Sequence, residues 1–150
     1  TGREDGLCLT LVKLSNCNMH KLVQIVRFES ARKLPKVPEG HPCGNVYGLA
    51  FKLEVHVEGK VDPETGFVID FGHIESAIKP TYDLIDHNYL NDIKGLENPT
   101  SEVLVEWIWN NLYKHFNNEW NFDKNQNKIC NLVKLVLWEN EVSRVEFNGN

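Results

Sequence analysis

The chain has 150 residues, and its composition is typical of one globular domain. Hydrophobic residues make up 41% and charged residues 25%, which excludes a disordered chain, a collagen-like chain or a coiled coil. A net charge of −5 argues against a general nucleic-acid-binding protein, because such proteins neutralise phosphates with lysine and arginine. No apolar run approaches the roughly 20 residues that a membrane span requires. We therefore expect a soluble protein with no nucleic acid and no membrane as partner, although a few local cations could still bind a small anion.

The first 18 residues are open to two interpretations. The sequence begins with Thr1, and its only methionine is Met19, directly before a strand-like run. Residues 1–18 are either an upstream extension or an expression-derived addition, with the functional domain at 19–150, or they include an additional edge strand at 8–14, where apolar residues are dense.

The four cysteines are not arranged as a metal site, because none lies in a CxxC motif or at zinc-finger spacing. They are Cys8, Cys17, Cys43 and Cys130. A core of this size needs no disulfides and no signal peptide is apparent, so we expect reduced thiols in a cytoplasmic protein. Cys43 differs from the others because it lies in a loop-like run, whereas Cys130 lies in an apolar segment that is typical of a structural cysteine.

The first half of the chain predicts strands. Residues 22–28 are rich in β-branched and aromatic side chains, which indicates a strand. Three prolines and two glycines predict a loop at 35–44. From 47 to 58 apolar residues alternate with polar or small ones, and this period of two predicts a long antiparallel strand with one buried and one wet face. A turn at 62–66 then predicts 67–71 as the hairpin partner.

Helical spacing follows in the middle of the chain. The pattern predicts a helix over 73–90 that is kinked or broken at Pro80. A second helix is predicted to begin with Asn98 as N-cap and Pro99 at the first helical position, and its apolar stripe extends to Phe116.

The C-terminal segment predicts a last hairpin. A polar loop at 117–128 is followed by strands at 132–138 and 142–147 around a short turn. The order of elements indicates an α+β fold, with a four-stranded antiparallel sheet and two helices on one face.

Several runs of the sequence carry a family resemblance. They are residues 28–31, 43–49, 84–92, 95–102 and 138–139, of which DHNYLN (86–91) and LENPTSE (96–102) are the most specific. These runs resemble the 6-pyruvoyl-tetrahydropterin synthase family, which includes 6-carboxytetrahydropterin synthase of the queuosine pathway. The resemblance extends from about residue 19 to the C-terminus. It implies the tunnelling fold (T-fold) and a homo-oligomer, a trimer or a hexamer, that binds a pterin between subunits.

The resemblance also shows where this chain departs from the family. Three histidines hold a catalytic zinc in the family, and the corresponding positions here are Arg32, Tyr47 and Leu49. Arginine keeps its proton at ordinary pH, leucine has no donor atom, and one tyrosine does not build a tetrahedral site. The six histidines of the chain offer no pair at i, i+2 or i, i+4 in compensation. We therefore predict no zinc at the family position and no other cofactor.

Other catalytic positions of the family are retained. The resemblance implies that Cys43 is the proton-abstracting thiol and that Asp86 and His87 complete its acid–base relay. It implies that Glu139 binds the 2-amino/N3 edge of the pterin through parallel N–H hydrogen bonds. Two further positions match residues that line this pocket, Thr100 and Ser101. Taken singly, each has a plainer interpretation: a loop thiol, an ion pair at a helix end, and a turn carboxylate.

Arg32 itself has two interpretations. Its guanidinium, a permanent cation, could occupy the former metal position, where it would activate Cys43 or bind a substrate oxygen or phosphate. Alternatively, Arg32 extends into solvent beside Lys33 and Lys36. Either way, Tyr47 and Leu49 are expected to fill the remaining space.

Two functions are compatible with these residues. The first is a carbon–oxygen lyase that acts on dihydroneopterin triphosphate or a related pterin through a Cys-Asp-His relay, without the usual zinc. The alternative is a non-catalytic pterin- or purine-binding pseudoenzyme or accessory subunit. Cys43 together with His87 distinguishes the two, because a protein that only binds does not need them.

Overall fold

Two long antiparallel strands form the centre of the computed structural model, which describes residues 19–149. β1 (Met19–Arg32) pairs with β2 (Tyr47–Lys60) along its whole length. On the other side of β2 lie β4 (Cys130–Trp138) and β5 (Arg144–Phe147), and the short β3 (Asn88–Tyr89) pairs with the end of β1. The expectations for residues 1–18, including a strand at 8–14, lie outside the described residues.

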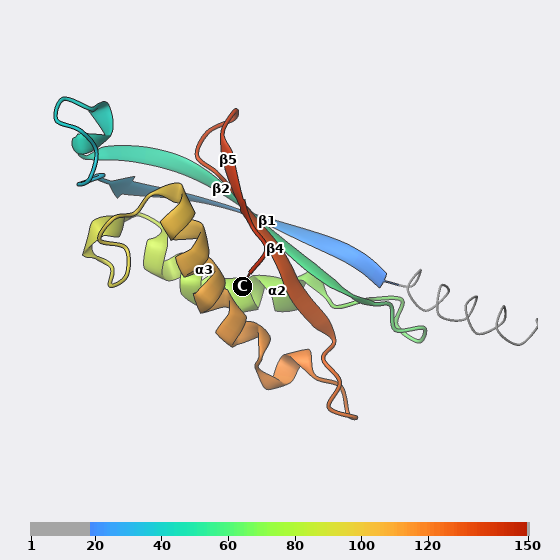
Figure 1. Ribbon diagram of the computed structural model, residues 1–150. Helices are drawn as coiled ribbons and strands as arrows, with labels where there is room; N and C mark the ends of the chain where they lie inside the picture. The colour runs from blue at the N-terminus through green and yellow to red at the C-terminus, as the bar shows by residue number, and fades with distance from the viewer. Residues whose placement is uncertain (1–18, 150) are drawn as a thin grey trace, which may run out of the picture.

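The α+β class is confirmed, but the expected four-stranded antiparallel sheet is wrong in detail. The sheet has five strands in the order β3-β1-β2-β4-β5, and β3 runs parallel to β1. Two helices, α2 (Phe71–Ile85) and α3 (Ser101–Phe116), lie on one face of this sheet, as expected (Figure 1). Three short 3-10 turns occupy the connections, at Pro42–Gly44, Leu90–Asp92 and Glu119–Asn121.

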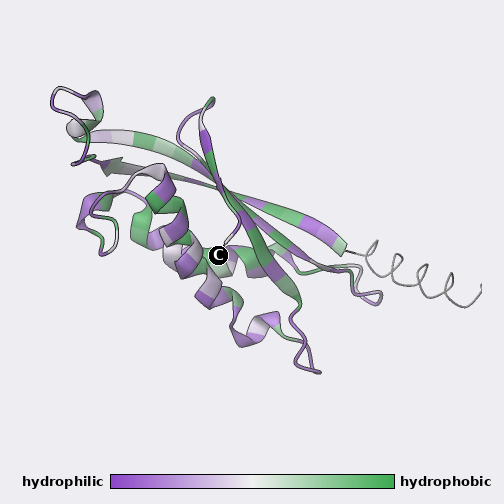
Figure 2. Ribbon diagram, viewed as in Figure 1, coloured by the Kyte–Doolittle hydropathy of each residue, from purple (hydrophilic) through white to green (hydrophobic). Residues whose placement is uncertain are grey.

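The core lies between the sheet and the helices. The predicted alternation in β2 is confirmed, since its inward side chains from Phe51 to Val57 are at most 2% exposed, and Figure 2 shows the corresponding bands of hydropathy. Phe28 of β1 stacks on Phe51 with ring centroids 4.9 Å apart. Burying one such side chain contributes about 1.5–3 kcal/mol. A shift of register by one residue would move the whole apolar set to solvent, so the alternation fixes which side of each strand faces the helices.

The predicted hairpin partner at 67–71 is wrong. The chain turns at 62–66, and Val68 and Ile69 pack into the core, but no strand forms there. Asp70 accepts a hydrogen bond from the backbone N–H of Gly72 (2.9 Å) and so acts as the N-cap of α2. The edge of β2 that this segment was expected to cover is paired with β4 instead.

The predicted boundaries of both helices need correction. α2 continues through Pro80 without a break and ends at Ile85 rather than at residue 90. α3 is capped by Thr100, whose hydroxyl accepts a hydrogen bond from the N–H of Val103 (3.2 Å), and not by Asn98. Pro99 therefore lies before the helix, and its carbonyl oxygen remains available to another donor.

No helix among residues 19–149 has the length and apolar character that crossing a membrane requires.

Candidate functional site

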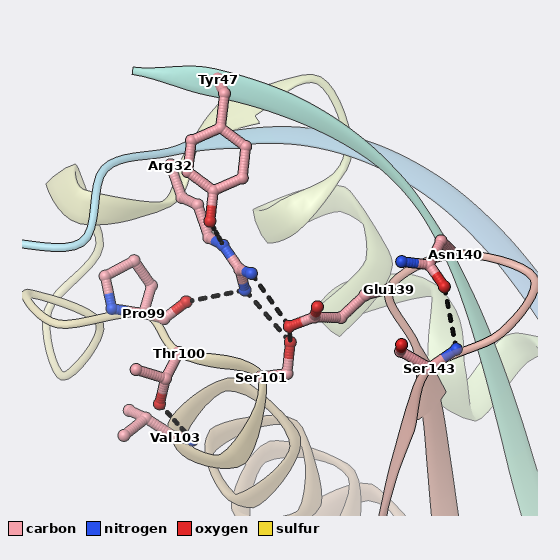
Figure 3. A network of polar contacts seen from close by, with 9 residues as sticks. All are labelled: Arg32, Tyr47, Pro99, Thr100, Ser101, Val103, Glu139, Asn140 and Ser143. Atoms are coloured by element: carbon pink, nitrogen blue, oxygen red, sulfur yellow. Dashed lines mark hydrogen bonds and ion pairs between the residues drawn. The ribbon is translucent and has the colours of Figure 1, made fainter. Parts of the chain in front are cut away.

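A buried arginine joins four separate segments at one end of the sheet (Figure 3). Arg32 is 3% exposed, so the interpretation in which it extends into solvent is wrong. Its Nε donates to the hydroxyl of Tyr47 (2.9 Å), and its NH2 donates to Oε1 of Glu139 (2.9 Å). NH1 donates to the Pro99 carbonyl (3.1 Å) and to Oγ of Ser101 (3.1 Å). The hydroxyl of Ser101 in turn donates to the same Oε1 of Glu139.

Local structure explains why these groups meet. Arg32 is the last residue of β1 and lies on the inward face, two residues after the buried Ser30. Tyr47 is its direct partner on β2. Ser101 begins α3, and Glu139 follows the last residue of β4. The site therefore forms where the ends of three strands meet the start of a helix.

Glu139 is stabilised as an anion. One of its carboxylate oxygens accepts hydrogen bonds from the protein, and the other accepts none from the described residues. Burial alone would raise the pKa of Glu139, but the hydrogen bonds from Ser101 and Arg32 and the charge of Arg32 outweigh it, so the pKa lies below its ordinary value. The second oxygen, Oε2, has no hydrogen bond from any described residue, and the side chain is 31% exposed. Glu139 can therefore accept hydrogen bonds from a ligand.

A cavity of about 810 Å³ opens beside this carboxylate. β4 begins to pair with β2 only at Lys52, so residues 47–51 of β2 have no strand partner on that side within the described part of the chain. Gly48, which has no side chain, and the small Ala50 line the cavity, together with Cys43. The volume falls within the roughly 300–1,000 Å³ typical of small-molecule sites.

Cys43 is placed beside the arginine network through Tyr47. Burial and a hydrogen bond with the Cys43 thiol raise the pKa of Tyr47, while Arg32 opposes this effect. The thiol is half-buried in the cavity wall. Cys130 is different, because it is fully buried and burial raises the pKa of its thiol to about 11. Cys43 is thus the accessible thiol of the described residues, as its loop position predicted.

Asp86 and His87 form a pair outside the cavity that holds Cys43. Oδ2 of Asp86 lies 2.8 Å from Nδ1 of His87, and Oδ1 accepts from the backbone N–H of Glu29 (3.0 Å). Asp86 is the C-cap of α2 and His87 has a φ of 55°, so the two residues leave the helix rather than extend it. The hydrogen bond and charge of Asp86 raise the pKa of the exposed His87 imidazole.

The structure thus brings together only part of the predicted site. Arg32, Ser101 and Glu139 form one network, and Cys43 joins it through Tyr47. His87 lines a neighbouring cavity of about 520 Å³ that shares only residues 48–50 with the first. Within residues 19–149, no hydrogen bond or ion pair links Cys43 to His87. Thr100 uses its hydroxyl as the cap of α3 and is not among the residues that line either cavity.

The three residues that the resemblance assigns to the family zinc position, Arg32, Tyr47 and Leu49, have a chemistry that does not fit a zinc ion. Arg32 carries a permanent positive charge, and four N–H hydrogen bonds fix its guanidinium in place. Leu49 offers no donor atom, and Tyr47 already accepts from Arg32. Across the described part of the chain, no group of three or more His, Cys, Asp or Glu residues is arranged to hold a metal. We derive no step of a mechanism through zinc.

Sequence reasoning did not identify the outer face of the sheet as part of the site. Nε1 of Trp138 donates to Oε2 of Glu54 (2.6 Å), and Nζ of Lys52 lies 4.5 Å from the centre of the Trp138 ring. The alternation in β2 had already assigned Lys52 and Glu54 to the wet face. What it lacked was the register with β4, which places Trp138 opposite Lys52.

Comparison with known proteins assigns the family. The model of the 6-pyruvoyl tetrahydropterin synthase family matches residues 21–150. A 6-carboxy-5,6,7,8-tetrahydropterin synthase from Synechocystis is 39% identical over 87 residues, which span 55% of this chain and 66% of that protein. A putative enzyme of the same name from Archaeoglobus fulgidus is 37% identical over 86 residues, 57% of this chain and 69% of that protein. The chain thus spans about two thirds of the length of these relatives.

Solved structures support the same fold. The Caenorhabditis elegans 6-pyruvoyl tetrahydropterin synthase has a TM-score of 0.73 at 20% identity, covering 88% of this chain and 96% of that one. The Plasmodium falciparum protein of that name has a TM-score of 0.64 at 14% identity, covering 88% and 98%. Together with the family match over nearly the whole described region, these findings show that the chain belongs to the 6-pyruvoyl tetrahydropterin synthase family.

Proposed function

We propose that this chain binds a pterin through Glu139 and does so without zinc. The observation that carries the proposal is the asymmetric state of the carboxylate: Oε1 accepts hydrogen bonds from Arg32 and Ser101, whereas Oε2 accepts none from the described residues, and Glu139 lines the cavity. The 2-amino/N3 edge of a pterin presents two N–H donors. Oε2 has two lone pairs, and hydrogen bonds to a charged acceptor are about twice as strong as neutral ones.

Arg32 supports this role by fixing the charge and the orientation of the carboxylate. A buried guanidinium cannot lose its proton, so Glu139 remains ionised at neutral pH. Because Arg32 also donates to the Tyr47 hydroxyl and the Pro99 carbonyl, it connects the carboxylate to β2 and to the segment before α3. This supplies, without metal, a positive charge at the position where the family places zinc.

We further propose a lyase activity on dihydroneopterin triphosphate or a related pterin. In it, Cys43 accepts a proton from the side chain of the substrate and Asp86 orients His87, whose imidazole exchanges a proton with the substrate. In one chain, Cys43 and His87 line different cavities. The relay therefore requires His87 from a second copy of the chain.

Open sheet edges support such a homo-oligomer, a trimer or a hexamer. Within the described residues, the side of β1 away from β2 has a strand partner only at Ser30 and Ala31. Among the strands that the structure describes, β5 pairs only with β4, so its outer edge is open too. Exposed edges of this kind are templates for pairing with another chain.

A binding protein without catalysis is the second candidate, and one observation favours it. The family's Lewis acid has no counterpart here, because Arg32 can donate hydrogen bonds but cannot coordinate a substrate oxygen. Such a pseudoenzyme or accessory subunit would bind a pterin or a purine through the same Glu139.

One experiment separates the two functions. The purified protein is analysed for metal and incubated with dihydroneopterin triphosphate after chelator treatment, and products are followed by chromatography, with Cys43→Ser as the catalytic control. Turnover by the metal-free protein that is lost in Cys43→Ser supports the lyase. Binding without product supports the second candidate. Absence of binding, or equal binding by Glu139→Gln, refutes the pterin site.

A further inference from the structure

The loop between β1 and β2 fixes both backbone groups of Cys43. The carbonyl oxygen of Cys43 accepts a hydrogen bond from the N–H of Leu34 (2.8 Å), two residues after Arg32. Its N–H donates to Nδ1 of the His41 imidazole (3.0 Å). The first bond joins Cys43 to the end of β1, and the second fixes the 3-10 turn Pro42–Gly44 to which the cysteine belongs.

His41 is the N-cap of this turn, and it caps through a ring nitrogen rather than through an oxygen. Its backbone is extended (φ −69°, ψ 135°), and Pro42 occupies the first position of the turn. Gly40, with a φ of 84°, reverses the chain directly before it. The usual capping residues are serine, threonine, aspartate and asparagine, none of which changes its charge between about pH 5 and 8. A histidine cap therefore adds a dependence on protonation that the usual caps lack.

Only the neutral imidazole can accept this hydrogen bond. In the neutral ring one nitrogen carries a proton and the other accepts, so the N–H of Cys43 requires the proton of His41 to be on Nε2. Protonation turns Nδ1 into a donor, which cannot accept from a second donor. The side chain of His41 is exposed, so it exchanges protons with solvent. The cap is thus present while His41 is neutral and is lost when His41 is protonated at mildly acidic pH.

Two charged residues, Lys33 and Glu39, line the same small cavity of about 310 Å³ as His41. Both are exposed and their charges are opposite. Among the residues that the structure describes, neither forms an ion pair with His41, and the ring makes no hydrogen bond besides the one from Cys43. The thiol of Cys43 contacts the hydroxyl of Tyr47. Protonation of His41 therefore removes one contact of its side chain, the cap on Cys43.

We propose that His41 is a positioning residue for Cys43, which holds the thiol in the cavity wall while the imidazole is neutral and releases it when the imidazole is protonated. The inference rests on the proposed function in one respect, because the proton-accepting role of Cys43 belongs to that proposal. His41 acts through the backbone of Cys43 and does not touch the substrate. Loss of one cap should make the open turn roughly fivefold more populated.

The test measures how accessible the Cys43 thiol is as a function of pH. Labelling by N-ethylmaleimide is followed by peptide mass spectrometry over about pH 5.5–7.5, the window in which histidine titrates. Each rate is divided by that of N-acetylcysteine at the same pH. Thiols ordinarily ionise above this window, so the division removes the common effect of pH on thiolate formation and the ratio reports on the turn.

Four proteins are compared: the unmodified chain, His41→Asn, His41→Ala and His73→Asn. Asparagine keeps an uncharged acceptor at the cap position, and alanine removes the acceptor. His73 is the matched control, because it lies on α2 and lines neither of the two cavities next to the turn. Cys130 is fully buried and should stay unlabelled in every folded variant.

In the unmodified protein and in His73→Asn, we expect the ratio to rise about fivefold as pH falls through this window. In His41→Asn the ratio should stay low at every pH, and in His41→Ala it should be high at every pH. A ratio that does not change with pH in the unmodified protein, or that rises equally in His41→Asn, would overturn the inference. Equal ratios for His41→Ala and the unmodified protein at neutral pH would overturn it too.

Incubation of the same proteins with dihydroneopterin triphosphate separates this inference from the proposed function. If labelling follows the expected pattern and none of the four proteins forms product, the positioning role of His41 is supported and the proposed lyase is refuted. If product forms but labelling of Cys43 is independent of His41, the positioning role is refuted and the proposed lyase stands.

Discussion

The buried ion pair between Arg32 and Glu139 should couple the two residues strongly, and the two single substitutions should destabilise the protein by different amounts. Replacing Glu139 by Leu leaves a guanidinium whose side chain is 4% exposed and which cannot lose its proton. Replacing Arg32 by Met leaves a carboxylate that is 31% exposed, keeps its hydrogen bond from Ser101 and can be hydrated. We therefore expect Glu139→Leu to destabilise the protein more than Arg32→Met does.

The geometry sets the magnitudes. At 2.9 Å and an effective dielectric constant of about 20, the charges attract by about 6 kcal/mol, from which the desolvation of both groups must be subtracted. Loss of one partner of a buried pair costs about 3–5 kcal/mol, which we assign to Glu139→Leu. For Arg32→Met we expect about 1–3 kcal/mol, because the remaining carboxylate is hydrated. The double variant should lose less than the sum, with a coupling free energy of about 2–4 kcal/mol.

Urea unfolding of the four proteins at one fixed protein concentration measures this cycle. The exposed pair of Lys79 and Asp83 on α2, with side chains 70% and 56% exposed, is the internal control and should show a much smaller coupling free energy, because water screens exposed charges. If the Arg32–Glu139 coupling is no larger than that of this control, the buried network does not hold the site together and the reasoning is refuted.

Three further predictions follow from the same structure. Because the pKa of Glu139 is lower in the folded than in the unfolded chain, its stabilisation is present above the unfolded pKa and is lost as pH falls through the lowered folded pKa. Glu139→Gln should flatten this acidic part of the stability profile measured by urea unfolding, and an unchanged profile would contradict the prediction. In an NMR titration, the pKa of the His87 imidazole should lie above the ordinary histidine value, and Asp86→Asn should return this pKa toward that value. Equal titration midpoints in the two proteins would show that Asp86 does not raise the pKa of His87. Gly59→Ala should lower the free energy of unfolding by about 1–3 kcal/mol, because a Cβ there would lie 2.5 Å from a backbone carbonyl oxygen, whereas Gly48→Ala, with 3.9 Å of room, should change it by less than about 0.5 kcal/mol; similar losses in both would refute this account of the packing.

The parts of the fold that were predictable are those with a strong local period. The alternation in β2 identified its buried face, because a half-buried strand repeats every two residues. The segment at 67–71 was mistaken for a strand because of its apolar side chains, of which Val68 and Ile69 pack in the core, while the cap made by Asp70 starts a helix at Phe71. The parallel pairing of β3, only two residues long, depends on tertiary contacts that leave no pattern in the sequence.

The sequence allowed us to predict which residues belong to the site, but not which of them contact one another. The family resemblance identified Arg32 and Glu139 as separate positions, 107 residues apart, but their ion pair depends on the relative placement of β1 and β4. The same resemblance grouped Cys43 with His87, which line different cavities in one chain.

The central claim is that Glu139, positioned by Arg32, binds a pterin without metal. The most direct measurement is titration calorimetry of the chelator-treated protein with 7,8-dihydroneopterin, repeated with added zinc and with Glu139→Gln. The account predicts binding by the metal-free protein, the same affinity in the presence of zinc, and at least about a tenfold loss in Glu139→Gln. Binding that appears only with zinc, or an affinity that Glu139→Gln leaves unchanged, would contradict it.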